Sequence, residues 1–252
     1  MTITEPVDSM TDEFPWMPWA NCRRTVDKMW DPLNTPHHSI IGLTGSGKSY
    51  LAINGILSMA QYDRVLIVDT KQDDPLVSKT GTAIEELPNR TWYQQLHRYE
   101  SSKKKPRGSW WRLVVKDDPI EARMQVHGAL KRVYDEGNWI VFLDEIRDIT
   151  DPKPPNINLG PWVDRLYRKG RSRRISVIAG TQSPAWVPRT FYDQASFAWI
   201  GRLRDEQRQK RLLEIGGMSR KALPILSSLE RRQWLLAADN GEFFARTKVE
   251  GV

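Results

Sequence analysis

The segment from Gly42 to Ser49 carries the residue types that bind phosphate groups. It reads Gly-Leu-Thr-Gly-Ser-Gly-Lys-Ser and satisfies in full the pattern of glycine, four residues and Gly-Lys-Ser. Glycines let backbone N–H groups wrap around phosphates, and a following helix N-terminus adds a favourable partial charge. The pattern predicts a P-loop in which Lys48 contacts the β- and γ-phosphates and Ser49 ligates Mg²⁺. The expected nucleotide-binding residues are Gly42, Thr44, Gly45, Ser46, Gly47, Lys48, Ser49 and Tyr50.

A second feature with chemical potential is the acid pair Asp144-Glu145, which follows the apolar run 140–143. Open α/β sheets bind ligands at the carboxyl ends of their strands, where this pair is expected to lie. There Asp144 can hold the Mg²⁺ shell, and Glu145 can act as the general base for an attacking water. Two acids alone are equally typical of a strand end or a helix N-cap. Together with the P-loop they indicate nucleotide hydrolysis.

A third candidate is Gln182, which follows the apolar run 175–179. A polar residue at that place is expected beside the γ-phosphate, where it senses the nucleotide or positions water. Without the other two motifs it would be an ordinary loop residue. The segment 70–73, Thr-Lys-Gln-Asp, resembles the guanine-specificity pattern of GTPases. Because it follows the second strand rather than a late one, we expect ATP as the nucleotide.

These motifs need elements to position them, and hydrophobic runs predict strands at 39–42, 64–69, 111–115, 139–143, 175–179 and 197–200. Helices are predicted at 48–60, 120–134 (ending near Gly137) and 162–169. Asp239-Asn240-Gly241 is typical of a hairpin turn. Strands that alternate with helices imply an α/β fold with a largely parallel sheet, helices on both faces and a C-terminal hairpin.

The predicted organisation has three parts. Residues 1–37 are rich in Pro and Trp, show no sustained period, and are interpreted as an arm that packs on the core or on a neighbour. The P-loop core spans 38–217 and contains an irregular insertion at 71–108, which is too long for a plain connection. A C-terminal extension with the hairpin spans 218–252.

Composition limits the classes of function. No run approaches the roughly 18 apolar residues of a membrane-spanning helix, and the N-terminus lacks a signal-peptide pattern, so we expect a cytoplasmic protein with no membrane partner. The single Cys22 and four scattered histidines make a structural metal unexpected. The net charge of +7 is uneven, since residues 160–211 hold twelve Lys/Arg against four Asp/Glu. Such a stretch is either a solvated face or a surface for a polyanion.

In this order, the motifs resemble those of the HerA/FtsK superfamily of DNA-pumping ATPases, over roughly residues 40–215. The segment 68–71, Val-Asp-Thr-Lys, is similar to the family's Asp-Pro-Lys, and Asp144-Glu145 to its Walker B pair. The most specific likeness is 169–182, with a basic segment, a strand and Thr-Gln. Gly180 replaces the usual alanine, Ser183 an arginine and Thr70 a proline.

The resemblance implies a RecA/ASCE-like P-loop NTPase that forms a homo-oligomeric ring, commonly a hexamer, with ATP between subunits and double-stranded DNA in the channel. On this interpretation Arg171 is the candidate arginine finger acting in trans, and Arg204 or Arg208 gives a second trans contact. The alternative is that the arginines near 171 are solvated or bind DNA phosphates. We expect the chain to lack the extra domains of chromosomal translocases, and it resembles a minimal viral or mobile-element motor.

The function expected from these features is an oligomeric ATPase that moves double-stranded DNA, in phage genome packaging, with a capsid portal as partner, or in DNA transfer. If the protein is viral, it would act in the host cytoplasm. Two alternatives stay open: a P-loop ATPase that drives assembly or secretion of a non-DNA cargo, and a small-molecule kinase. A built-in nuclease is not expected, because the late acids Asp239, Glu242 and Glu250 form no clustered triad.

Overall fold

A single mixed sheet organises the molecule. The computed structural model describes residues 13–29, 35–59, 64–87, 109–203, 205, 207–210, 212, 220–238 and 243–250. Within these residues the sheet has nine strands in the order β3-β4-β2-β5-β6-β1-β7-β8-β9. The strands are β1 (His38–Ile41), β2 (Arg64–Asp69), β3 (Thr82–Ile84), β4 (Ser109–Val114), β5 (Trp139–Leu143), β6 (Ile175–Thr181), β7 (Phe197–Ile200), β8 (Gln233–Ala238) and β9 (Phe243–Lys248).

The sheet is parallel from β3 through β7 and antiparallel only in its last two pairings, β7 with β8 and β8 with β9. The central strands are buried along their whole length, as expected for parallel strands covered on both faces. This confirms the predicted α/β class. Strands β8 and β9 pair as a hairpin requires, and its predicted turn at 239–241 lies outside the described residues.

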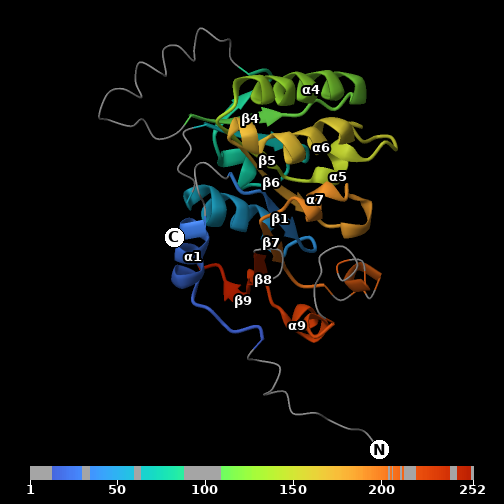
Figure 1. Ribbon diagram of the computed structural model, residues 1–252. Coiled ribbons are helices and arrows are strands. Elements are labelled where there is room, and N and C mark those ends of the chain that lie inside the picture. The colour runs from blue at the N-terminus through green and yellow to red at the C-terminus, as the bar shows by residue number, and fades with distance from the viewer. Residues whose placement is uncertain are drawn as a thin grey trace, which may run out of the picture.

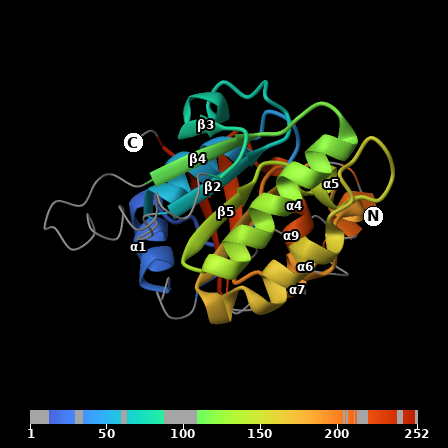
Figure 2. The same ribbon diagram turned by 90° about the horizontal axis from the view of Figure 1, so that it is seen from above.

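Helices cover both faces of the sheet. Figure 2 shows α4, α6 and α7 on one side of the strands and α1 on the other. Two separate hydrophobic clusters match these two faces. The helical segments are α1 (Trp19–Met29), α2 (Lys48–Tyr50), η2 (Leu51–Ile56), η3 (Leu57–Met59), η4 (Val77–Lys79), α4 (Pro119–Glu136), α5 (Ile146–Thr150), α6 (Gly160–Lys169), η5 (Arg171–Arg173), η6 (Pro184–Trp186), α7 (Thr190–Asp193) and α9 (Ala222–Ser228).

Local sequence signals explain the best-defined helix, α4. Its N-cap Asp118 accepts hydrogen bonds from the backbone N–H groups of Ile120 and Glu121, each at 2.9 Å. The helix ends at Gly137, which has a φ of 67° that L side chains rarely adopt. The predicted glycine stop is therefore confirmed.

The N-terminal segment contains a helix that the sequence reading did not anticipate. Residues 19–29 form α1, and Trp19, Cys22 and Val26 are buried against the P-loop face of the sheet. This spacing of three and four residues is helical, but it extends over only two turns after a Pro-rich stretch, which hides the period. In Figure 1, α1 lies beside β9, so the two ends of the described chain meet there.

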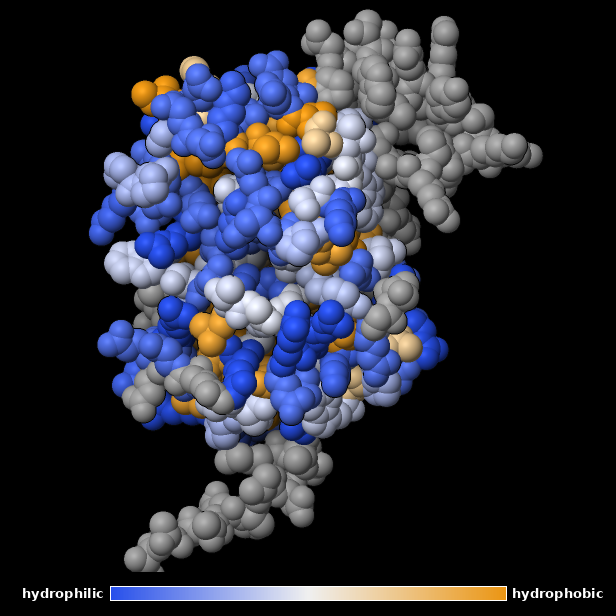
Figure 3. Space-filling view, turned by 180° about the vertical axis from the view of Figure 1, so that it is seen from behind, coloured by the Kyte–Doolittle hydropathy of each residue, from blue (hydrophilic) through white to orange (hydrophobic). Residues whose placement is uncertain are grey.

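The predicted insertion at 71–108 is also more regular at its start than expected. It contributes η4 and the edge strand β3, which pairs with β4, while residues 88–108 lie outside the described part. Strand β3 has three residues and a mostly exposed pattern, so no apolar run marks it in the sequence. On the face shown in Figure 3, hydrophobic side chains occupy limited areas between hydrophilic ones.

Candidate active site

Three neighbouring strands end at one edge of the sheet, and the candidate catalytic groups lie there. The P-loop follows β1, the acid pair follows β5, and Gln182 follows β6. Because Ile41 pairs with Thr181, and Leu143 with Ala179, these strand ends are level with one another. Parallel pairing therefore brings segments more than 130 residues apart into one site.

The P-loop is held open for a phosphate by its glycines. Gly45 and Gly47 have φ values of 76° and 98°, in the left-handed region that favours glycine. Lys48 is buried, and its Nζ donates to the carbonyls of Gly42 at 3.0 Å and Leu43 at 3.2 Å. Burial lowers the pKa of Lys48 to about 8. The two hydrogen bonds hold the Lys48 side chain over the loop, where phosphate is predicted to bind.

Ser49 connects the loop to two acids. Its hydroxyl donates to Asp74 Oδ2 at 2.6 Å and lies 3.3 Å from Asp144 Oδ1. Burial works against ionisation of Asp74, but the Ser49 hydroxyl and the backbone N–H groups of Leu76 and Val77 prevail and lower its pKa. Asp74, in the β2–β3 loop, carries no sequence signal that would have marked it as a site residue.

The acid pair shares a cation. Lys71 Nζ lies 3.5 Å from Asp144 Oδ2 and 3.5 Å from Glu145 Oε2. Burial raises the pKa of Asp144 and of Glu145, while the nearby ammonium limits the rise. For Lys71, burial is outweighed by the two carboxylates, and its pKa is raised. The resemblance to the family's Asp-Pro-Lys motif drew attention to Lys71 but gave it no role.

Gln182 links the P-loop to Glu145. Its Oε1 accepts a hydrogen bond from the Thr44 hydroxyl at 2.6 Å, and its backbone N–H donates to Glu145 Oε1 at 3.4 Å. A residue in this position contacts both the phosphate loop and the candidate base, so displacement of either would move the other.

A hollow of about 470 Å³ opens between these groups. Arg208, a candidate for the second trans contact, lines the hollow of its own chain, where its Nη1 donates to the Gln182 carbonyl at 3.2 Å. The other candidate, Arg204, lies outside the described residues. The lining residues are Leu43, Thr44, Lys71, Glu145, Arg147, Asp148, Gln182, Ser183 and Arg208. Its mixture of two acids with three cations suits a phosphate chain and its counterion.

Arg171 is the predicted site residue that the structure does not bring to this site. It lies in η5, before β6, and therefore at the opposite edge of the sheet from the P-loop. Its Nη2 donates to the carbonyl of Gln194 at 2.8 Å and to the Ser196 hydroxyl at 3.2 Å. Arg174, in the same turn, is exposed. A contact between Arg171 and nucleotide would need a second copy of the chain.

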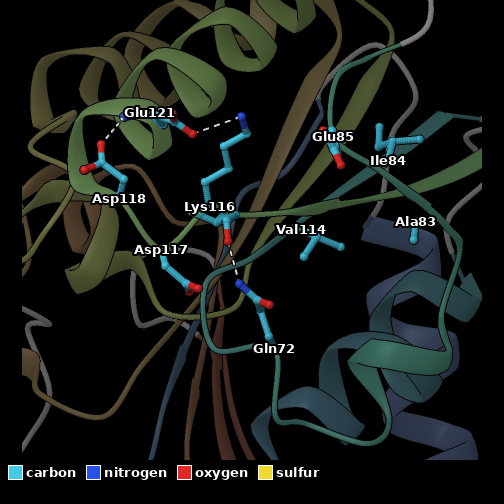
Figure 4. Close-up of a pocket in the computed structure, with 10 residues that line it drawn as sticks. Gln72, Ala83, Ile84, Glu85, Val114, Lys116, Asp117, Asp118 and Glu121 are labelled. Carbon is cyan, nitrogen blue, oxygen red and sulfur yellow. Dashed lines mark hydrogen bonds and ion pairs between the residues drawn. The ribbon is translucent and has the colours of Figure 1, made fainter.

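A second hollow, of about 650 Å³, lies at the ends of β3 and β4. Figure 4 shows Lys116 directed at Glu121, with which it pairs at 3.0 Å, while the Gln72 amide donates to the carbonyl of Val115. The lining residues are Gln72, Ala83, Ile84, Glu85, Val114, Val115, Lys116, Asp117, Asp118 and Glu121. Four acids against one lysine make this larger hollow unsuitable for a phosphate chain.

The fold and the loop between β1 and α2 define the class: this is a P-loop NTPase fold. The solved structures with this fold include the genome packaging NTPase B204 from Sulfolobus turreted icosahedral virus 2 in complex with AMPPCP, with a TM-score of 0.62 and 16% identity, covering 88% of this chain and all of B204. VirB4 of Thermoanaerobacter pseudethanolicus aligns with a TM-score of 0.61 and 13% identity, covering 86% and 90% of the two chains.

One curated sequence relative is Protein P9 of Pseudoalteromonas phage PM2. It is 22% identical over 218 residues, which cover 84% of this chain and 91% of P9. No protein-family model matches the sequence. At these low identities, it is the structural alignments with B204 and VirB4 that show a shared fold. Within the described part of the chain, no helix has the length and apolar character needed to cross a bilayer.

Proposed function

We propose that this protein is an ATP-hydrolysing motor that works as an oligomer and moves double-stranded DNA, as a viral genome-packaging ATPase does. The observation that carries the proposal is the convergence of Lys48, Glu145 and Gln182 at one edge of the sheet. These are the lysine of the P-loop, a buried carboxylate, and a polar residue that bonds to Thr44 of the loop and to that carboxylate. The likeness to packaging NTPase B204, solved with AMPPCP and with ATP-gammaS, supports ATP as the nucleotide, and the likeness to a phage protein supports a viral role.

The residues around Ser49 fit Mg²⁺. Asp144 Oδ2 is buried, accepts no hydrogen bond from any described residue and faces the Lys71 ammonium at 3.5 Å, so it lies where a cation is favourable. In the same part of the chain, no three His, Cys, Asp or Glu form a metal cluster. This agrees with Mg²⁺, which is held by one or two protein oxygens together with substrate phosphates. Ser49 and Asp144 would hold it, and the ion would neutralise phosphate charge when bound.

The chain's own residues supply the rest of the chemistry. Lys48 exchanges its two carbonyl partners for phosphate oxygens, since an ammonium binds charged oxygens more strongly than carbonyls. Glu145 accepts the proton of the attacking water, and burial keeps its pKa above that of an ordinary glutamate, which makes it a better base. Gln182 holds the Glu145 carboxylate through its backbone N–H and senses the P-loop through Thr44.

Asp74 is a positioning residue for the metal in this proposal. We expect Asp74→Asn to raise the Mn²⁺ concentration for half-maximal binding to the ATP complex about tenfold, the low end of the effect of residues that orient metal ligands. Asparagine keeps the oxygen that caps Leu76 and Val77 but loses the charge facing Ser49. Electron paramagnetic resonance of Mn²⁺ measures the binding. Asp73→Asn, at the exposed neighbour, is the control. An unchanged Mn²⁺ titration in Asp74→Asn would show that Asp74 only accepts the hydrogen bonds of Leu76 and Val77 and does not position the metal.

The distribution of cations supports DNA as the polymer. In the basic stretch, α6 and the turn before β6 present exposed arginines and lysines. The exposed residues there are Arg165, Arg168, Lys169, Arg173 and Arg174. They lie at the edge of the sheet opposite the P-loop, so DNA and ATP would occupy different surfaces of the protein. Phosphate contacts of this kind are independent of sequence and sensitive to salt.

The ATPase rate with and without double-stranded DNA tests the proposal. We expect DNA to stimulate hydrolysis at low salt. With as few as four phosphate contacts, the DNA concentration for half-maximal stimulation should rise about 100-fold between 50 and 200 mM salt. Mass measurement in the same buffer should show an oligomer. Phosphate release that ignores DNA at low salt would leave an ATPase with another cargo, and release only with an added acceptor would indicate a kinase.

A further inference from the structure

Beside the P-loop, an arginine lies over the ring of a tyrosine. The Arg232 guanidinium lies 4.0 Å from the centroid of the Tyr50 ring. Tyr50 directly follows Ser49, whereas Arg232 precedes β8 and is 182 positions further along the chain. Both side chains are half-buried. A cation that lies over an aromatic ring is attracted to the face of that ring. The pair therefore forms a charged surface next to the loop.

The backbone fixes Arg232 against the loop. Its N–H donates to the Ser46 carbonyl at 3.0 Å, and its own carbonyl accepts from the N–H of Val249 at 3.0 Å. A methyl group added at Gly47 would lie 3.1 Å from Arg232 Cγ, so the arginine stem occupies the space that the glycine leaves. Arg232 also has a φ of 63°, in the left-handed region where an arginine is unfavourable. Such strain is typical of positions where the side chain serves a purpose.

The position of Tyr50 and Arg232 indicates which part of a bound nucleotide they would contact. Glu145, Lys71 and the hollow beside Gln182 mark the end of the loop where the γ-phosphate reacts. A triphosphate that lies along the loop with its γ-phosphate at that end directs its nucleoside the opposite way. Tyr50 and Arg232 do not line that hollow: Arg232 contacts Ser46 and Gly47, and Tyr50 ends the short helix α2 that follows the loop.

We propose that Arg232, supported by Tyr50, stacks on the nucleobase of the bound nucleoside triphosphate. This inference rests on the proposed function and assigns a residue to the base end of the same site. The guanidinium is planar and weakly hydrated, so its outer face suits a base, while its inner face rests on the Tyr50 ring. Stacking does not read the hydrogen-bonding edges of a base. The pair therefore binds adenine and guanine nucleotides alike.

Binding of ATP compared with inorganic tripolyphosphate, which has no base, tests this assignment. Isothermal titration calorimetry with Mg²⁺ should show that Arg232→Ala raises the Kd for ATP and for GTP about tenfold, equivalent to about 1.4 kcal/mol. The Kd for tripolyphosphate should stay within about twofold, because the phosphate contacts are intact. Arg232→Lys keeps the charge without the planar face and should weaken ATP binding about threefold. Arg231→Ala, at the exposed neighbour, should change neither affinity.

The outcomes separate the inference from the function on which it rests. Equal weakening of ATP and tripolyphosphate by Arg232→Ala and Arg232→Lys would make Arg232 a support of the loop and overturn the stacking role. Unchanged ATP binding in Arg232→Ala would overturn it as well, while the ATPase proposal stood. A wild-type protein that binds neither ATP nor tripolyphosphate would overturn both.

Discussion

Glu145→Gln should reduce ATP hydrolysis by about 10²–10⁴-fold, the contribution typical of a general base. Glutamine has nearly the same shape but cannot accept the proton of the attacking water. ATP binding should remain within about threefold of wild type, because Lys48 and the loop glycines are untouched. Single-turnover phosphate release and calorimetric titration with ATP measure the two quantities separately.

The matched control for this variant is Asp148→Asn, a second acid in the same hollow. Asp148 accepts from the Thr70 hydroxyl at 3.3 Å and lines the hollow. It should change the rate less than about fivefold, as expected for a charge that does not take the proton. If Asp148→Asn abolished hydrolysis while Glu145→Gln stayed active, the base would be Asp148.

Because burial raises the pKa of Glu145, acid should inactivate the wild type at a higher pH than an ordinary glutamate would allow.

The fold could be predicted from the sequence because its central strands are buried on both faces. Continuous apolar runs such as 65–68 and 140–143 are marked by composition alone, and each is followed by an aspartate at the site edge. The P-loop and the acid pair belong to these same junctions. Local pattern therefore identified the strands and the groups attached to them.

The parts that could not be predicted depend on long-range contacts. Asp74 meets Ser49 through a loop of irregular sequence, and Arg232 reaches Tyr50 from the far end of the chain. Neither residue has a neighbour in the sequence that reveals its partner. The edge strand β3 and helix α1 are short, and tertiary packing decides their conformation rather than propensity. The site is thus completed by segments whose role appears only after folding.

The arrangement of the two edges of the sheet bears on how the motor would assemble. Glu145 lies at the carboxyl edge and Arg171 at the amino edge of the same β5–β6 region. One chain cannot bring Arg171 to its own nucleotide. In a ring whose head-to-tail contacts set the amino-edge surface of one subunit against the carboxyl edge of the next, Arg171 would reach the nucleotide of the neighbouring subunit. A finger supplied in trans is compatible with this geometry, and it predicts complementation between inactive variants.

Two inactive variants, Glu145→Gln and Arg171→Ala, should regain hydrolysis when they are mixed. Each active site then needs Glu145 from one subunit and Arg171 from its neighbour. Random mixing in equal amounts should restore about a quarter of the wild-type rate, because half of the subunits keep each group. Steady-state phosphate release after co-refolding or subunit exchange measures the rescue.

The control mixture contains Glu145→Gln and Lys48→Ala, which both damage the same side of the interface. No combination of these subunits forms a complete site, so the mixture should remain inactive.

Arg174→Ala, which changes an exposed arginine of the same turn, serves as the comparison for Arg171. Rescue with Arg174→Ala instead would move the finger to Arg174. An Arg171→Ala protein that hydrolyses ATP alone would show that its bonds to Gln194 and Ser196 are structural. Rescue of Arg171→Ala by Glu145→Gln, with none in the control, would require each site to span two subunits.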